Sequence, residues 1–217
     1  MSIGIAAAAV FAVFMFLTYY MQQNLGLSPV INGLAFLPMT ATIIVSAGLA
    51  STRLLPRFGP RALIVIGMLL GASGMLYLTG IGVHSGYAAH VLPALLVMGA
   101  GFGLIFAPAM ATATFGVAPH DAGVASAMVN ANQQVGGAVG VALLSTVASS
   151  AASSYLAGSH ASAAALAAAT VHGYTTAFAW SSGIFLVGAL VAALLLRAGA
   201  PRAGVAADRA AAPALVH

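Results

Sequence analysis

The chain has 217 residues, of which 62% are hydrophobic and only 4% are charged; its mean hydropathy is +1.08 and its formal net charge is +4. A soluble domain carries about 25% charged residues, so this composition excludes a soluble globular protein and predicts an integral membrane protein with several spans. The chain contains no cysteine, which excludes disulfides and thiol chemistry.

Long apolar runs predict an all-α membrane protein with six transmembrane helices. The predicted spans cover about residues 3–21, 32–50, 62–81, 91–113, 122–147 and 174–196. Ser28-Pro29 is a typical helix start, and Pro38 should kink the second span. An Ala/Ser-rich segment from about Ser149 to Thr170 favours helix but lacks the bulk for a firm core or a strong span. The tail, residues 198–217, is predicted to be disordered and cytoplasmic.

The arginines define the predicted orientation in the membrane. With six spans, the loop between the second and third helices and the tail lie on the same side. These two segments hold all six arginines: Arg53, Arg57, Arg61, Arg197, Arg202 and Arg209. The positive-inside rule then places both chain termini in the cytoplasm, and a count of five or seven spans would split the arginines.

The fifth span carries amides in an otherwise apolar helix. At about 100° per residue, a stripe of small and polar side chains falls within an arc of about 100°. It consists of Gly123, Ser126, Asn130, Gln133, Gln134 and Gly137. Amides facing lipid without partners would cost several kcal/mol, so the stripe should face other helices or water. Gly136 and Gly140 form a small-xxx-small pair, which predicts close approach of a neighbouring helix on another side.

The motifs, taken together, resemble a known transporter family. In chain order they are YYMQQNLGLSP, NGLAFLPMT, LLPRFGPR, GLIFAPAMATA, DAGVASAMVNANQQVGGAVGVALL and HGYTTAF. This series resembles the C-terminal six-helix half of major facilitator superfamily transporters, and within them the fourteen-span drug:proton antiporters of the EmrB/QacA type. The resemblance covers about Phe11 to Arg197.

The resemblance implies that the chain takes part in small-molecule transport, as drug or metabolite efflux driven by a proton gradient at the plasma membrane. It implies no cofactor, a bilayer and a small-molecule substrate as partners, and no nucleic acid. The family's loop pattern G-x-x-x-D-R-x-G-R-R is matched by Arg57, Gly59 and Arg61, whereas Pro56 stands at the acidic position. It also implies a truncated transporter that needs an N-terminal half or a homodimer partner. The alternative is a non-transporting six-helix membrane module or assembly partner.

Two sets of residues are the candidate functional sites, and each has a simpler structural reading. The predicted cavity lining consists of Asn130, Gln133, Gln134, Tyr20 and Gln23. The amides could instead hydrogen-bond between helices, and Tyr20 and Gln23 could be interfacial anchors. The predicted cytoplasmic gating loop consists of Arg53, Arg57, Gly59 and Arg61, which could equally serve only to fix topology.

Enzymatic and metal sites are not expected. The histidines lack the spacing and nearby carboxylates of a metal site. An intramembrane hydrolase would need an activated serine and a base, and Ser181-Ser182-Gly183 lacks such a frame.

Overall fold

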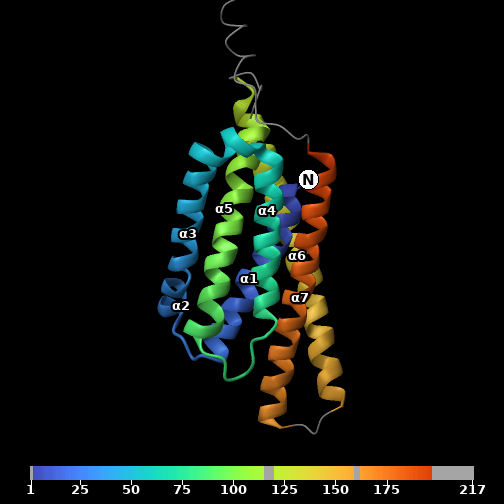
Figure 1. The fold of residues 1–217 in the computed structure, drawn as a ribbon. Helices are drawn as coiled ribbons and strands as arrows, with labels where there is room; N and C mark the ends of the chain where they lie inside the picture. The colour runs from blue at the N-terminus through green and yellow to red at the C-terminus, as the bar shows by residue number, and fades with distance from the viewer. Residues whose placement is uncertain (1, 115–119, 159–161, 197–217) are drawn as a thin grey trace, which may run out of the picture.

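The computed structural model describes residues 2–114, 120–158 and 162–196, and every regular element within these ranges is a helix (Figure 1). The predicted all-α fold is therefore confirmed. The predicted tail, residues 198–217, lies outside the described residues, as do the three arginines at and after residue 197.

The helices differ in length from the predicted spans. In chain order they are α1 (Ser2–Gln23), α2 (Pro29–Ala35), α3 (Leu37–Leu49), the π-helical turn η1 (Ala50–Leu54), α4 (Leu55–Leu78), the π-helical turn η2 (Tyr87–Val91), α5 (Leu92–Thr114), α6 (Ala122–Ala157) and α7 (Ala163–Leu195). The Ala/Ser-rich segment is absorbed into the end of α6 and the start of α7. These ends project as a helical pair beyond the other helices (Figure 1).

Proline positions explain the division of the second predicted span. Pro29 stands at the first turn of α2, and the Ser28 hydroxyl accepts a hydrogen bond from the backbone N–H of Ile31 at 3.4 Å. Pro38 lacks an N–H group, so it cannot continue the backbone ladder of α2. The helix is accordingly interrupted at Phe36, and α3 begins at the next residue. The predicted kink at Pro38 is therefore present as a break between α2 and α3.

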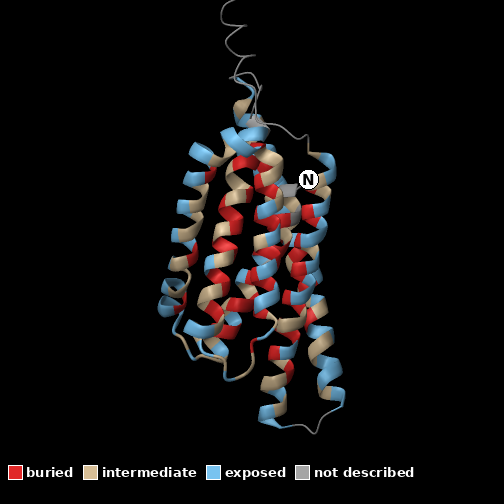
Figure 2. Ribbon diagram, viewed as in Figure 1, coloured by how far each residue is buried: buried red, intermediate tan, exposed pale blue. Residues whose placement is uncertain are grey.

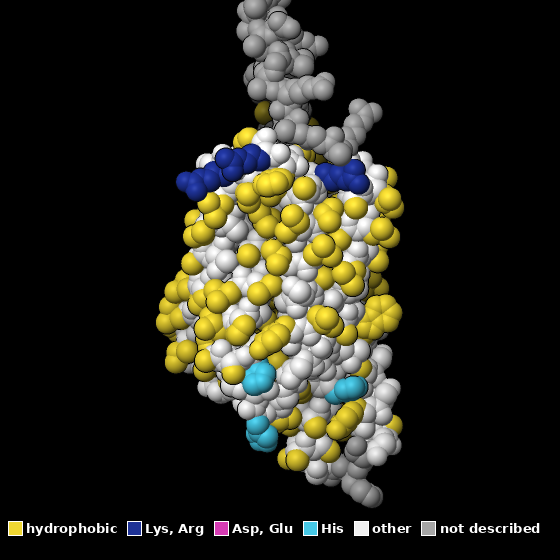
Figure 3. All heavy atoms as spheres, viewed as in Figure 1, with side chains coloured by type: hydrophobic (Ala, Val, Ile, Leu, Met, Phe, Trp, Pro, Cys, Tyr) yellow, Lys and Arg dark blue, Asp and Glu magenta, His cyan; other side chains and the backbone are white. Residues whose placement is uncertain are grey.

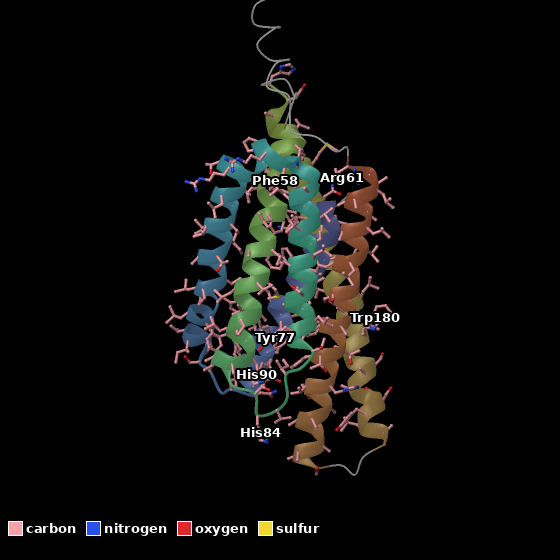
Figure 4. All side chains as sticks on the ribbon, in the orientation of Figure 1. Phe58, Arg61, Tyr77, His84, His90 and Trp180 are labelled. Carbon is pink, nitrogen blue, oxygen red and sulfur yellow. The ribbon has the colours of Figure 1, made fainter. Side chains whose placement is uncertain are left out.

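The chain reverses direction between α3 and α4, at the end of the molecule where the arginine side chains gather (Figure 1). Gly59 has φ 73° and ψ 169°, a backbone conformation that side chains with a Cβ rarely adopt. Pro60 directly follows and starts the regular part of α4. This turn, with Arg53, Arg57 and Arg61, defines the arginine end of the molecule. The opposite end, marked by His84 and His90, is the histidine end (Figures 3 and 4).

Two groups of helices pack side by side to form the bundle. In one group α5 lies between α3 and α4, and in the other α1 packs against α6 and α7. Contact between α4 and α7 joins the groups. Buried residues line the inside of the bundle and exposed ones its outside (Figure 2). The largest buried side chains of the junction include Phe102, Phe178 and Phe185, and the rings of Phe102 and Phe185 stack with centroids 5.9 Å apart.

Glycines also permit close helix contacts between α4 and α5 and between α3 and α5. A Cβ on Gly67 of α4 would lie 2.6 Å from the carbonyl oxygen of Gly101 in α5. A Cβ on Gly99 would lie 2.6 Å from the carbonyl oxygen of Met39 in α3. Both crossings bring backbone against backbone, so any larger residue would force the helices apart.

Five segments within the described residues are long and apolar enough to cross a membrane. They are Ala6–Gln23, Pro29–Leu78, Tyr87–Thr112, Ala122–Ala157 and Ala163–Leu195. The second has 50 residues and contains the α3–α4 reversal, so it is folded into two antiparallel rods (Figure 1). The number of membrane crossings, six, stays a prediction.

Candidate functional site

Two amides of the stripe, Asn130 and Gln134, lie where the rest of the described chain does not cover α6, whereas Gly137 at the end of the stripe is buried against the ring of Phe11 in α1. Asn130 and Gln134 are exposed, and Gln133 is half-buried. Gln133 borders a small cavity of about 280 Å³ between α5 and α6, together with Phe106, Met110 and Val129. The stripe therefore presents two amides outward and one toward a gap between helices.

The other side of α6 is packed through its glycines. A Cβ on Gly136 would collide with the backbone of Gly4 in α1, and one on Gly140 with the backbone of Ala8. The predicted close approach at the small-xxx-small pair is thus confirmed, and the neighbour is α1. One face of α6 is consequently fixed against α1 while the face with Asn130 and Gln134 remains open.

Asn132 behaves differently from the stripe. Its Nδ2 donates to the carbonyl oxygen of Met128, one turn earlier in the same helix, at 3.0 Å. This bond gives the Asn132 amide a partner within its own helix.

Tyr20 and Gln23 lie near the C-terminal end of α1, far from the amides of α6. A Cβ on Gly4, at the other end of α1, would lie 3.3 Å from the backbone oxygen of Asn132, and Tyr20 is sixteen positions further along the helix. At 1.5 Å per residue this separation is about 24 Å. The five residues of the predicted cavity lining therefore form two groups, and the structure does not bring them into one site.

Tyr20 is fully buried and holds a loop. Its hydroxyl donates to the carbonyl oxygen of Gly82 at 2.8 Å, with a second contact to the carbonyl oxygen of Ser85 at 3.1 Å. Tyr87 makes a related contact, since its hydroxyl donates to the carbonyl oxygen of Ala35 at 2.7 Å. Tyrosines thus fasten the histidine end of the bundle, a role that the sequence analysis did not assign to Tyr87.

Gln23 belongs to a pocket that the sequence analysis missed. This rim pocket lies between α1, α6 and α7 at the histidine end and has a volume of about 320 Å³. Its hydrogen-bonding lining consists of Tyr19, Gln23, Ser145, Ser149, Thr170 and Tyr174. The only sequence signal for it was the spacing of Ser145 and Ser149, which places two hydroxyls one turn apart on α6.

The residues of the predicted gating loop surround the α3–α4 reversal. Arg53 and Arg57 are exposed and Arg61 is half-buried. The only acidic residue in the described ranges is Asp121, which pairs with the neighbouring His120 at 3.2 Å. In the described part of the chain, therefore, no carboxylate forms an ion pair with these arginines. Figure 3 shows the arginines at one end and histidines toward the other, as the predicted loop order requires.

The serine pair of α7 is used in helix packing. The Ser181 hydroxyl donates to the carbonyl oxygen of Ala177, and that of Ser182 to the carbonyl oxygen of Ala72 in α4 at 3.0 Å. Both serines are buried, and the Ser182 hydroxyl joins α7 to α4 while the Ser181 bond stays within α7. Among the described residues, no group of three or more His, Asp or Glu side chains is arranged to hold a metal ion.

An apolar hollow lies on the outer surface of α7. It has a volume of about 610 Å³ and is bordered by Trp180, Ile184 and Val187. The Trp180 side chain points away from the bundle and is 60% exposed (Figure 4). A hollow of this kind suits hydrocarbon, and it lacks the convergent polar groups that fix a polar ligand.

Comparisons with known proteins identify what the chain is similar to. The sequence profile described as Major Facilitator Superfamily matches residues 1–141. The chain is 48% identical over 196 residues to the puromycin resistance protein pur8 of Streptomyces alboniger, covering 89% of this chain and 39% of that protein. It is 36% identical over 143 residues to the cephamycin export protein CmcT of Amycolatopsis lactamdurans, covering 66% of this chain and 29% of that protein.

A third relative is the tetracenomycin C resistance and export protein of Streptomyces glaucescens, 36% identical over 133 residues, with 59% of this chain and 24% of that protein covered. The chain thus spans about two fifths or less of the length of these curated relatives.

Proposed function

We propose, from the premise that this chain belongs to the major facilitator superfamily, that it forms one helical bundle of a transporter that exports drug-like small molecules. The names of its relatives refer to resistance to puromycin, export of cephamycin, and resistance to and export of tetracenomycin C. A transporter rather than an enzyme is also what this family membership implies.

The observation that carries the proposal is the two-sided character of α6. One side is locked against α1 through Gly136 and Gly140, and the other exposes Asn130 and Gln134. In a membrane-spanning helix, an exposed amide must find water or a hydrogen-bonding partner, because leaving it in hydrocarbon costs several kcal/mol. A water-filled cavity shared with a second bundle would supply both water and hydrogen-bonding partners. Amides in such a cavity carry no charge of their own and can bind varied solutes.

The finer assignment is the fourteen-span EmrB/QacA type, with this chain as the C-terminal half. In this assignment both ends of the chain face the cytoplasm at the plasma membrane, which is supported by Arg53, Arg57 and Arg61 at one end of the bundle. The second bundle would be an N-terminal half or another copy of this chain in a parallel arrangement.

Proton coupling would place the titratable carrier outside the described helices. A coupled antiporter needs an ionisable group that meets both sides of the membrane in turn. The described helices contain no Asp or Glu, since Asp121 precedes α6 and is exposed. The proposed carrier is therefore a carboxylate of an N-terminal half, since the described helices of a second copy of this chain would not supply one, and collapse of the proton gradient should abolish export.

A chimera tests the proposed function. The chain replaces the segment that it matches in the Streptomyces alboniger puromycin resistance protein, and cellular accumulation of puromycin is measured. We expect the chimera to lower accumulation and the separate 217-residue chain to leave it unchanged. A chimera present in the membrane at normal abundance that leaves accumulation unchanged would contradict the proposal. Transport by the separate chain would instead favour a homodimer, and crosslinking would detect it.

Substitutions within the chimera test the amides. Asn130→Leu combined with Gln134→Leu should reduce export at least tenfold for polar substrates, since one lost hydrogen bond of about 1.4 kcal/mol corresponds to a factor of ten. Asn132→Leu is the matched control, because this amide bonds its own helix. Equal losses in both variants would indicate a packing role for the amides.

A further inference from the structure

The rim pocket has features of a binding site that are independent of the amide stripe on α6. Its walls combine aromatic faces with hydrogen-bonding side chains. The rings of Phe16 and Tyr174 lie together with centroids 5.7 Å apart, and Tyr174 donates its hydroxyl to Oε1 of Gln23 at 3.3 Å. This bond fixes the Gln23 amide at the mouth of the pocket and leaves its Nε2 group to donate elsewhere.

The two serines of the pocket differ from nearby threonines in the hydrogen bonds that their hydroxyls make. Thr146 and Thr170 donate to carbonyl oxygens one turn earlier in their own helices, at 3.0 Å and 2.9 Å. Ser145 and Ser149 make no such bond within the described structure, although backbone carbonyls are available at the same spacing. Their hydroxyls are therefore ready to bond a guest, and they stand one turn apart along the same wall.

The floor of the pocket is rigid. A Cβ on Gly173 would lie 2.6 Å from the carbonyl oxygen of Ala148, so α6 and α7 are in backbone contact directly beneath it. Beyond this contact, the rings of Tyr155 and His172 pack with centroids 5.1 Å apart and tie the two helices again. These contacts hold α6 and α7 together next to the pocket.

The lining defines the chemistry of the guest. No lining residue carries a formal charge, and the pocket offers aromatic faces, an amide and hydroxyls. Its volume of about 320 Å³ lies at the lower limit of small-molecule sites, so it fits one substituted ring system rather than a whole large drug. An uncharged aromatic group with a hydrogen-bond acceptor matches these groups best.

We propose that the rim pocket is a second binding site, which takes the uncharged aromatic part of an exported compound at the histidine end of the bundle. That the bound compound is one the transporter exports rests on the proposed function, whereas the binding itself does not depend on transport. On α6 the pocket lining begins at Ser145, eleven residues or about 16 Å along the helix from Gln134, so the pocket is a separate site from the amides.

Cysteine protection tests this binding in the purified full chain. The chain has no cysteine, so Ser149→Cys introduces a single thiol inside the pocket. Ser150→Cys is the matched control, since this adjacent exposed residue does not line the pocket. The probe is naphthalene-2-carboxamide, and the rate of reaction with a neutral maleimide is measured in lipid nanodiscs.

With a dissociation constant of about 1 mM, 5 mM probe should slow labelling of the Ser149→Cys variant about sixfold and leave the Ser150→Cys variant unchanged. Naphthalene-2-sulfonate, which carries a charge, and cyclohexanecarboxamide, which lacks a ring face, should protect less than twofold. Ser145→Cys, with Thr146→Cys as its control, gives a second reading if the first variant does not fold.

No protection at either pocket position, or equal protection at pocket and control positions, would overturn the inference. Equal protection by the charged or the aliphatic probe would overturn the assigned ligand class. These outcomes are separate from the puromycin chimera. Protection without export would refute the transport function and leave the pocket as a binding site, whereas export without protection would refute only the pocket.

Discussion

Removal of one hydroxyl at Tyr20 should release the loop at the histidine end. Tyr20→Phe keeps the buried ring and deletes only the group that contacts the carbonyl oxygens of Gly82 and Ser85. A hydroxyl has one hydrogen, so the contacts at 2.8 Å and 3.1 Å are shared and count as little more than one bond. Water can reach the half-buried carbonyls in the variant, which limits the loss to about 1 to 1.5 kcal/mol.

This loss should appear as local opening rather than global unfolding. A change of about 1.4 kcal/mol is a factor of ten, so amide exchange in residues 79–86 should accelerate about five- to tenfold. Hydrogen exchange followed by mass spectrometry measures this directly. The backbone amides of Gly82 and Ser85, which are bonded within the loop, are the reporters.

Tyr19→Phe is the control for this measurement. Tyr19 precedes Tyr20 in the same helix, but its ring is 45% exposed and does not anchor the loop. Removal of the Tyr19 hydroxyl should leave the rate of amide hydrogen exchange in residues 79–86 unchanged. Tyr20→Phe could also leave exchange in residues 79–86 unchanged, or accelerate exchange equally throughout α4 and α5. Either result would show that the hydrogen bond from the Tyr20 hydroxyl does not order the loop.

Two further substitutions test the packing of the bundle. Gly140→Leu should abolish a folded, monodisperse chain in size-exclusion chromatography, because its side chain would meet the backbone of Ala8, whereas Gly183→Leu should be tolerated because open space surrounds Gly183. Equal tolerance of both would contradict the α1–α6 contact. Ser182→Ala should lower stability by about 0.6 kcal/mol, a typical value for interhelical bonds in membranes, while Ser181→Ala should change it less because that bond lies within α7. Thermal unfolding in one detergent measures both.

Local signals in the sequence predicted much of the fold. Pro38 cannot donate a backbone hydrogen bond, so a break before α3 could be expected from this residue alone, and Gly59 followed by Pro60 permits a reversal that few other residue pairs allow. The glycine pair at Gly136 and Gly140 predicted a close neighbour, although not that the neighbour would be α1. Such features depend on the residues themselves, which is why they can be identified without knowing the tertiary structure.

The helix ends around the Ala/Ser-rich segment were less predictable. Alanine has the highest helix propensity, but small side chains give a weak apolar signal, so the spans were predicted to end near residue 147 and to resume near residue 174. The helices instead continue to Ala157 and resume at Ala163. Helix propensity and the apolar signal of the side chains thus gave different helix ends, and the ends in the structure agree with helix propensity.

The rim pocket could not be predicted because its walls meet only in three dimensions. The hydrogen bond between Tyr174 and Gln23 joins residues 151 positions apart, and the hydrogen bond from Tyr20 to Gly82 joins residues 62 positions apart. No periodicity within one helix reports such pairs. The same limitation explains why Tyr20 and Gln23 were grouped with the α6 amides: polarity within a membrane helix identifies side chains that need partners, but it does not locate the partners.

The position of α1 connects these separate features. Its N-terminal half fits into the glycine face of α6 at Gly136 and Gly140, and its C-terminal end carries Tyr20 and Gln23. Because α1 and α6 are in backbone contact at these glycines, the amide stripe and the rim pocket both lie on one closely packed pair of helices. Any rocking of this bundle against a second one would therefore move both sites together, and the loop fastened by Tyr20 would move with them.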